Sequence, residues 1–183
     1  MILAILLAAS TPAAAAPQTD FLAEIRAGRQ LCVNPDLVNK ICSTIDSFAG
    51  SADGTLTNMG ETILAPEPLV TLETSSIAHI DGATNCGMLD LADLQKGRVR
   101  VNGQLLPPEQ NAAVISQIIE KLGFLAGHKT CETLHVDGGN LTETASIEGI
   151  DIKIPNKLVA WITPGDGYKV GASSAPVPAA ASR

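Results

Sequence analysis

Alternating apolar and polar residues run through most of the chain after residue 43 and predict an antiparallel sheet built from hairpins. Residues 43–64 place two β-tolerant runs on either side of a turn cluster rich in Gly, Ser and Asp. Residues 69–80 alternate and lead into an Asp-Gly dipeptide, and residues 98–106 alternate at their start and contain an Asn-Gly dipeptide; both dipeptides are typical of two-residue hairpin turns. Further strands are expected at residues 129–136, 141–147, 150–154 and 157–162, and in a short segment before residue 170.

A period of three to four residues replaces this alternation in one long segment, residues 108–126, and predicts an amphipathic helix there. Its apolar side carries isoleucines and leucines, and Gly127 follows as a suitable residue just past the C-terminus. Two shorter helices are expected near the N-terminus. One lies within residues 19–28, and the other spans residues 35–42, with Asn34 as N-cap and Pro35 at the first helical position.

These elements predict an α+β fold: an antiparallel sheet of β-hairpins, one amphipathic helix at about 108–126 packed on the sheet, and short N-terminal helices. The length of 183 residues, with 45% hydrophobic and 17% charged residues, suits one globular domain, which we expect to span residues 16–170. Residues 171–183 are small residues and prolines with little to bury, so a flexible tail is expected.

The first residues have the pattern of a secretory signal peptide. An apolar run from Ile2 to Ala9 is followed by a Thr-Pro break and an alanine tract, which predicts cleavage near residue 15. No Lys or Arg precedes the run, and the run is too short to span a bilayer. We therefore expect an exported, soluble protein, periplasmic or secreted, with no membrane attachment after cleavage.

Four cysteines remain after the predicted cleavage site, and an even number in an exported chain predicts two disulfides. Four cysteines allow three pairings, and we favour Cys32 with Cys42 and Cys86 with Cys131. The first of these pairs requires residues 32–34 to fold back along the short helix expected at 35–42, because disulfides need Cα atoms within about 7 Å.

His128, Cys131 and His135 are spaced at intervals of three and four, which would bring all three to one face of a helix. The surrounding Thr and Val residues and the turn at 137–140 instead favour an extended strand over 129–136, in which only Cys131 and His135 share a face. This strand is expected to form a hairpin in which Val136 lies opposite Leu141. We accordingly expect no metal site and no cofactor.

Few residues suggest catalysis. The local motifs of serine hydrolases, metalloproteases and phosphate-binding loops are absent from the sequence. The weak candidates for a general base are His79, which lies beside Asp81, and the histidines at 128 and 135.

The net charge of the chain argues against one class of partner. Nineteen acidic against twelve basic residues give a net charge of −7, which disfavours nucleic acid. The expected function is a non-catalytic exported domain, structural or binding a ligand or a protein. The alternatives are a small extracytoplasmic enzyme with a histidine general base near a carboxylate, and an assembly component that offers a sheet edge for strand addition.

Overall fold

The computed structural model describes residues 19–50 and 55–173, and strands dominate it, with 49% strand against 19% helix. The predicted signal peptide at 1–15 and most of the predicted tail lie outside the described residues. The elements are α1 (Phe21–Arg26), β1 (Gln30–Val33), β2 (Ile41–Cys42), β3 (Thr44–Gly50), β4 (Thr55–Ala65), β5 (Val70–Asp81), β6 (Thr84–Met88), α2 (Leu91–Gln95), β7 (Arg98–Val101), β8 (Gln104–Leu105), α3 (Pro108–Leu122), the 3₁₀ helix η1 (Gly123–Leu125), β9 (Lys129–Asp137), β10 (Asn140–Ile147), β11 (Lys157–Ile162) and β12 (Lys169–Val170).

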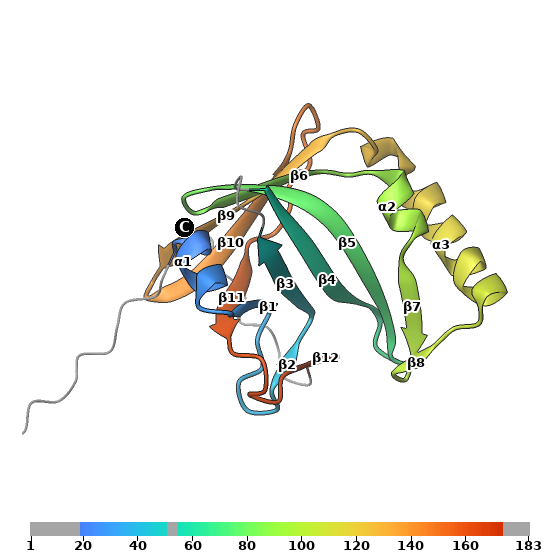
Figure 1. The fold of residues 1–183 in the computed structure, drawn as a ribbon, viewed down its shortest axis with the longest axis horizontal. Coiled ribbons are helices and arrows are strands. Elements are labelled where there is room, and N and C mark those ends of the chain that lie inside the picture. The colour runs from blue at the N-terminus through green and yellow to red at the C-terminus, as the bar shows by residue number, and fades with distance from the viewer. Residues whose placement is uncertain (1–18, 51–54, 174–183) are drawn as a thin grey trace, which may run out of the picture.

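Eight of these strands close into an antiparallel barrel (Figure 1). The order around the barrel is β4-β3-β1-β11-β10-β9-β6-β5, and a ladder between β4 and β5 closes the ring. The start of β5, from Val70 to Glu73, also pairs with β7, so the β7–β8 hairpin extends the sheet away from the barrel. A separate two-stranded parallel sheet joins β2 to β12.

The α+β class expected from the sequence is therefore wrong. Six barrel ladders join strands that follow one another closely, but two ladders join strands distant in sequence: β1 with β11, and β6 with β9. These two long-range ladders turn a row of hairpins into a ring, and alternation along a strand does not reveal them.

Several local predictions are confirmed. The β9–β10 hairpin has the expected register, with Val136 opposite Leu141 and His135 opposite Thr142. The turn between β7 and β8 places both Asn102 (φ 49°) and Gly103 (φ 80°) in the left-handed region that this two-residue turn requires.

Two predicted elements are absent from the described chain. Residues 35–40 form a tight turn in place of the helix expected at 35–42, because Asn34 (φ 50°) and Lys40 (φ 53°) are left-handed and Asp36 accepts hydrogen bonds from the backbone of the turn. Residues 150–154 form no strand; after Gly149 (φ 76°) only an isolated bridge remains.

Helix α1 closes one end of the barrel. Its N-cap Asp20 accepts a hydrogen bond from the Ala23 backbone at 3.1 Å, and Phe21 is fully buried among inward-facing side chains. The ring of Phe21 meets Phe48 and Trp161 edge-on, with centroids 5.9 and 5.4 Å apart. This end of the interior is therefore apolar.

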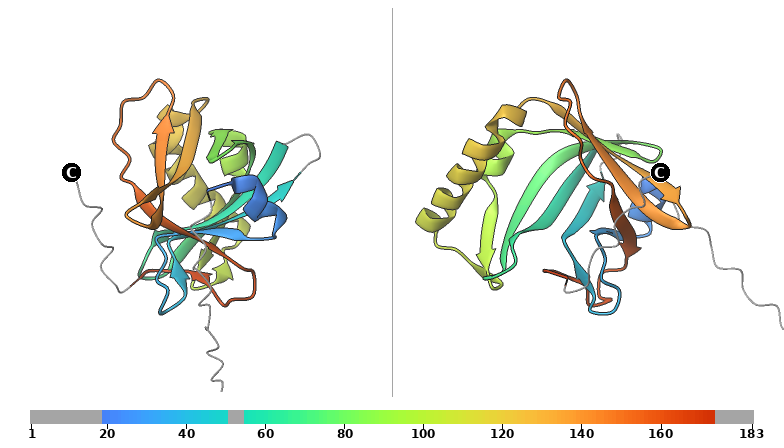
Figure 2. Two further views of the ribbon diagram at one scale, coloured as in Figure 1. Left: turned by 90° about the vertical axis from the view of Figure 1, so that its left-hand side faces the viewer. Right: turned by 180° about the vertical axis from the view of Figure 1, so that it is seen from behind.

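Helices α2 and α3 lie on the other side of the molecule from α1 (Figures 1 and 2). The predicted long helix forms as α3 but ends at Leu122, after which the chain continues as η1. Ile115 of α3 packs against Leu72 and Val99, so α3 covers the sheet where β5 pairs with β7. No helix among the described residues has both the length and the apolar character needed to cross a membrane.

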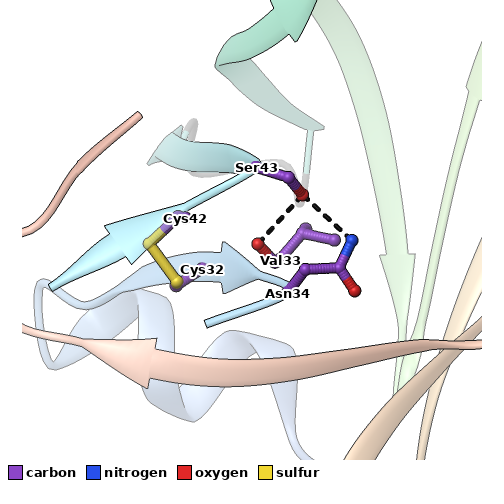
Figure 3. The surroundings of a disulfide bond; sticks show 5 residues. All are labelled: Cys32, Val33, Asn34, Cys42 and Ser43. Atoms are coloured by element: carbon purple, nitrogen blue, oxygen red, sulfur yellow. Dashed lines mark hydrogen bonds between the residues drawn. A yellow bond between two sulfur atoms is a disulfide. The ribbon is translucent and has the colours of Figure 1, made fainter. Parts of the chain in front are cut away.

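Both disulfides are present in the pairing that the sequence favoured. Cys32 and Cys42 lie 5.4 Å apart at Cα, and beside them the Ser43 hydroxyl donates to the Val33 carbonyl and accepts from the Asn34 amide, both at 3.1 Å (Figure 3). Cys86 and Cys131 are directly opposite each other on β6 and β9, outside the barrel. These bonds fit a protein that works outside the reducing cytoplasm.

Candidate ligand-binding site

Charged side chains point into the barrel from four strands. Directly paired residues share one face of an antiparallel sheet, so the register identifies which residues face inward. On each of these strands the charged residue is two positions from a large inward-facing apolar residue. The pairs are Asp46 with Phe48, Glu132 with Leu134, Glu143 with Leu141, and Lys157 with Val159.

These residues form a group of three carboxyls around one ammonium. Glu143 is 2% exposed and lies directly opposite Lys157, whose Nζ is 3.2 Å from Glu143 Oε1. Asp46 and Glu132 are close enough for their charges to act on both partners of this ion pair. One cation thus faces three acids, and the interior has an excess of negative charge when all are ionised.

Burial and mutual repulsion hold two of the acids close to neutral. Desolvation, reinforced by the charges of Glu143 and Asp46, raises the pKa of Glu132 to about 7. Desolvation and the charge of Glu143 also raise the pKa of Asp46, to about 6. Burial alone would lower the pKa of Lys157, but its three acidic neighbours outweigh burial and raise that pKa. Lys157 therefore stays charged at neutral pH, while Glu132 is divided between its two forms.

Two asparagines connect this group to the rest of the interior. The Asn85 side chain hydrogen-bonds Glu132, which is directly opposite it in the β6–β9 ladder, and the Asn58 side chain hydrogen-bonds Asp46. A carboxylate accepts from the amide nitrogen, so the amide oxygen is left over. In both asparagines this Oδ1 atom is buried and has no hydrogen-bond partner in the described part of the chain.

A cavity of about 180 Å³ lies beside these groups. Its wall is made by Asn58, Asn85 and Glu132, together with hydroxyl and small residues of β5, β6 and β9. Since one water occupies about 30 Å³ of liquid, the cavity has room for roughly six waters or one small organic molecule.

The segment that joins β6 to α2 forms one side of the cavity. Leu89 and the buried Leu94 supply apolar surface, and Asp90 and Asp93 supply carboxylates. Asp90 is engaged as the N-cap of α2, accepting from the Ala92 backbone at 2.8 Å, and Asp93 pairs with Lys96 at 2.9 Å. Glu132 is therefore the lining carboxylate that neither caps a helix nor has an ion-pair partner among the described residues.

A larger groove on the outside of the barrel adjoins the cavity. It has a volume of about 850 Å³ and runs along β3, β4, β5 and β7. Thr74, Ser75 and Asp93 line both the groove and the cavity, so the two spaces meet between the middle of β5 and the start of α2.

The histidines singled out from the sequence are elsewhere. His79 is exposed on the outer face of β5, opposite Cys86, and His135 is on the outer face of β9. The ring Nδ1 of His128 lies 2.8 Å from the Glu148 carbonyl oxygen. None of the three lines the cavity. Over the described residues, no group of three or more His, Cys, Asp or Glu side chains is arranged to hold a metal ion.

Sequence reasoning missed Asp46, Glu132, Glu143 and Lys157. Charged residues that alternate with hydrophobic ones are normally assigned to the solvent face of a strand. The available signal was their phase: each lies an even number of positions from a large apolar residue on the same strand, as in Glu132-Thr-Leu134 and Lys157-Leu-Val159. A charge in phase with the core residues of its strand faces the same way as they do.

The protein is a closed antiparallel barrel with a polar cavity inside it. Comparisons with protein-family models, curated proteins and solved structures give no match for this chain. The cavity and the residues that line it are therefore the basis for a functional proposal.

Proposed function

We propose that this chain is an exported, non-catalytic binding protein that holds a small molecule in the cavity inside its barrel. The observation that carries the proposal is a cavity of about 180 Å³ whose wall includes Glu132 and two asparagines, and the amide oxygens of both asparagines have no partner within the described chain. Buried polar atoms without partners are costly, and native proteins keep few of them. A bound molecule that hydrogen-bonds to these groups would offset that cost.

The architecture supports a small ligand over a macromolecular partner. Eight-stranded barrels have an interior wide enough to be filled by side chains or to hold one small ligand. Closure also removes the long free edge that strand addition needs, because the described strands outside the ring, β2, β7, β8 and β12, have four residues or fewer.

Export is supported by two features of the chain. The N-terminal segment has the apolar run and small-residue cleavage site of a signal peptide. Two disulfides would be maintained in the periplasm or outside the cell.

A small extracytoplasmic enzyme is the second candidate, and the structure suggests a different base from the histidines. Glu132 lines the cavity with a pKa of about 7, which suits a general base at neutral pH. Of the hydroxyls in the described lining, that of Thr130 donates to the Gly87 carbonyl, which activates no nucleophile, so we favour binding. Conversion of a bound compound by the wild type but not by Glu132→Gln would favour the enzyme.

The binding proposal is tested by filling the cavity. Ser76 faces inward on β5 and lines the cavity, and Ser146 is exposed on the outer face of β10, so Ser76→Leu and Ser146→Leu make a matched pair. Ligand-observed NMR would screen a fragment set of roughly six to ten non-hydrogen atoms. We expect fragments that bind the wild type and Ser146→Leu but not Ser76→Leu. Equal binding to Ser76→Leu, or no binding to the wild type at millimolar concentration, would overturn the proposal.

A further inference from the structure

We propose that the molecule held in the cavity is a small organic cation, a protonated amine or amidine, whose charge pairs with Glu132. This inference rests on the proposed function and adds the chemical class of the ligand. It follows from the sign of the charges around the cavity, the hydrogen-bonding groups that lack partners, and the space available.

The charged side chains that line the cavity are all acidic among the described residues. Its charged lining residues are Glu132, Asp90 and Asp93, and no Lys, Arg or His is among the described residues that form it. Behind the wall, Lys157 is already paired with Glu143 at 3.2 Å. An anionic ligand would meet only negative charge here, whereas a cation would offset the excess of carboxylates inside the barrel.

Asn85 points independently to a donor on the ligand. Its side chain is 6% exposed, it lines the cavity, and its amide binds Glu132 while its Oδ1 has no partner in the described chain. Asn85 and Glu132 are directly opposite each other in the β6–β9 ladder, so the amide oxygen and the carboxylate are neighbours. A group with several N–H donors, such as an ammonium or amidinium, can satisfy both acceptors at once.

Size and ligand count favour an organic cation over a metal ion. The described residues offer no set of three carboxylate, histidine or cysteine ligands, whereas a volume of about 180 Å³ is far larger than a bare ion needs. An engineered apolar cavity of roughly 150 Å³ is known to hold benzene, so this one suits a cation with a small carbon skeleton.

The test compares three probes of one shape: cyclohexylammonium, cyclohexanol and cyclohexanecarboxylate. Each is titrated by NMR into the wild type, into Glu132→Gln, and into Glu148→Gln, which removes an exposed carboxylate that does not line the cavity. A charge-assisted hydrogen bond predicts that wild type and Glu148→Gln bind the ammonium roughly tenfold or more tightly than the alcohol. In Glu132→Gln this preference should fall below about threefold, while the affinity for the alcohol is unchanged.

Titration at several pH values adds a readout that loss of folding could not imitate. Because the cation needs the ionised form of Glu132, its affinity for the wild type should rise about fivefold or more from pH 5.5 to pH 8 and stay flat in Glu132→Gln.

Each result decides between the two proposals. Equal binding of alcohol and ammonium, or a preference for the carboxylate, would overturn the cation inference and leave the cavity as a binding site. Binding of the ammonium with the same preference in Glu132→Gln would overturn it too. If no probe binds and the fragment screen is also negative, the proposed function fails with it.

Discussion

Replacing Glu132 by Gln should stabilise the protein at neutral pH and flatten the pH dependence of its stability. The change removes the carboxyl group whose ionisation inside the barrel is opposed by burial and by the charges of Glu143 and Asp46. The amide has nearly the same shape and can still accept from Asn85, so the interior packing is preserved.

The magnitude follows from the difference in pKa between the folded and unfolded chain. The Glu132 carboxyl ionises with a pKa of 4.5 in an unperturbed chain and about 7 in the fold, so the folded state binds the proton more tightly. Stability from this group is therefore present at low pH and is lost as the pH rises through this interval. From pH 5 to pH 7.5 the loss is on the order of 2 kcal/mol. Asp46, with a pKa of about 6, adds to the loss in the same direction.

Urea unfolding at pH 5, 6, 7 and 7.5 measures this directly. The chain has one tryptophan, Trp161, which packs against Phe21 inside the barrel, so its fluorescence reports the loss of the core. For a urea dependence of roughly 2 kcal/mol per molar, the midpoint of the wild type should fall by about 1 M between pH 5 and pH 7.5. Glu132→Gln should lose less than half as much and be the more stable protein at pH 7.5.

Glu148→Gln is the matched control, because it removes an exposed carboxylate and should follow the wild-type curve. If wild type and Glu132→Gln have parallel midpoints across this pH range, Glu132 is not desolvated in the fold and the reasoning about the interior charges is refuted.

Three further variants test other parts of the structure. Phe21→Ala removes the fully buried ring that caps the barrel and should cost roughly 3–5 kcal/mol in chemical unfolding; a loss under 1 kcal/mol would contradict that packing. Lys157→Met leaves the buried carboxyl of Glu143 without its cation and should lower the free energy of unfolding at pH 7.5 by about 3 kcal/mol; a loss under about 1 kcal/mol would be inconsistent with a buried ion pair. The double change Cys86→Ala and Cys131→Ala opens a loop with a sequence separation of 45 and should lower the free energy of unfolding by about 4 kcal/mol in thermal or urea unfolding. A double variant as stable as the unreduced wild type would show that this disulfide is not formed.

Local structure could be predicted from the sequence wherever neighbouring residues determine it. The β9–β10 register followed from the turn at 137–140 and the alternation on either side, and the extended backbone from Lys129 to Asp137 separated His128 from Cys131 and His135 as expected. The long helix and the Asn102-Gly103 turn were likewise predictable. In each of these cases the partners are adjacent in the chain.

Barrel closure could not be predicted in this way. It depends on Gln30–Val33 pairing with residues near 160 and on Thr84–Met88 pairing with residues near 131, and neither pairing leaves a mark on local alternation. The turn at 35–40 was mistaken for a helix because Pro35 and the apolar Leu37, Val38 and Ile41 fit helical spacing. In the fold, Leu37 and Val38 are exposed and Asp36 binds the backbone of the turn.

The binding site was missed for the same reason. In an open sheet one face meets water, and Asp46 or Glu132 would be placed there. Only a closed ring puts the charged residues of β3, β9, β10 and β11 into one interior. Their phase with Phe48, Leu134, Leu141 and Val159 becomes meaningful once the inward face of each strand is known.

The location of Glu132 inside the barrel can be tested most directly by a carbon-13 NMR titration of its side-chain carboxyl group, assigned through Glu132→Gln. An interior carboxyl beside Glu143 and Asp46 predicts a titration midpoint of about 7. A midpoint near the ordinary value of 4.5 would show that this side chain faces water, and it would contradict the placement of Glu132 in the wall of the cavity on which the binding proposal depends.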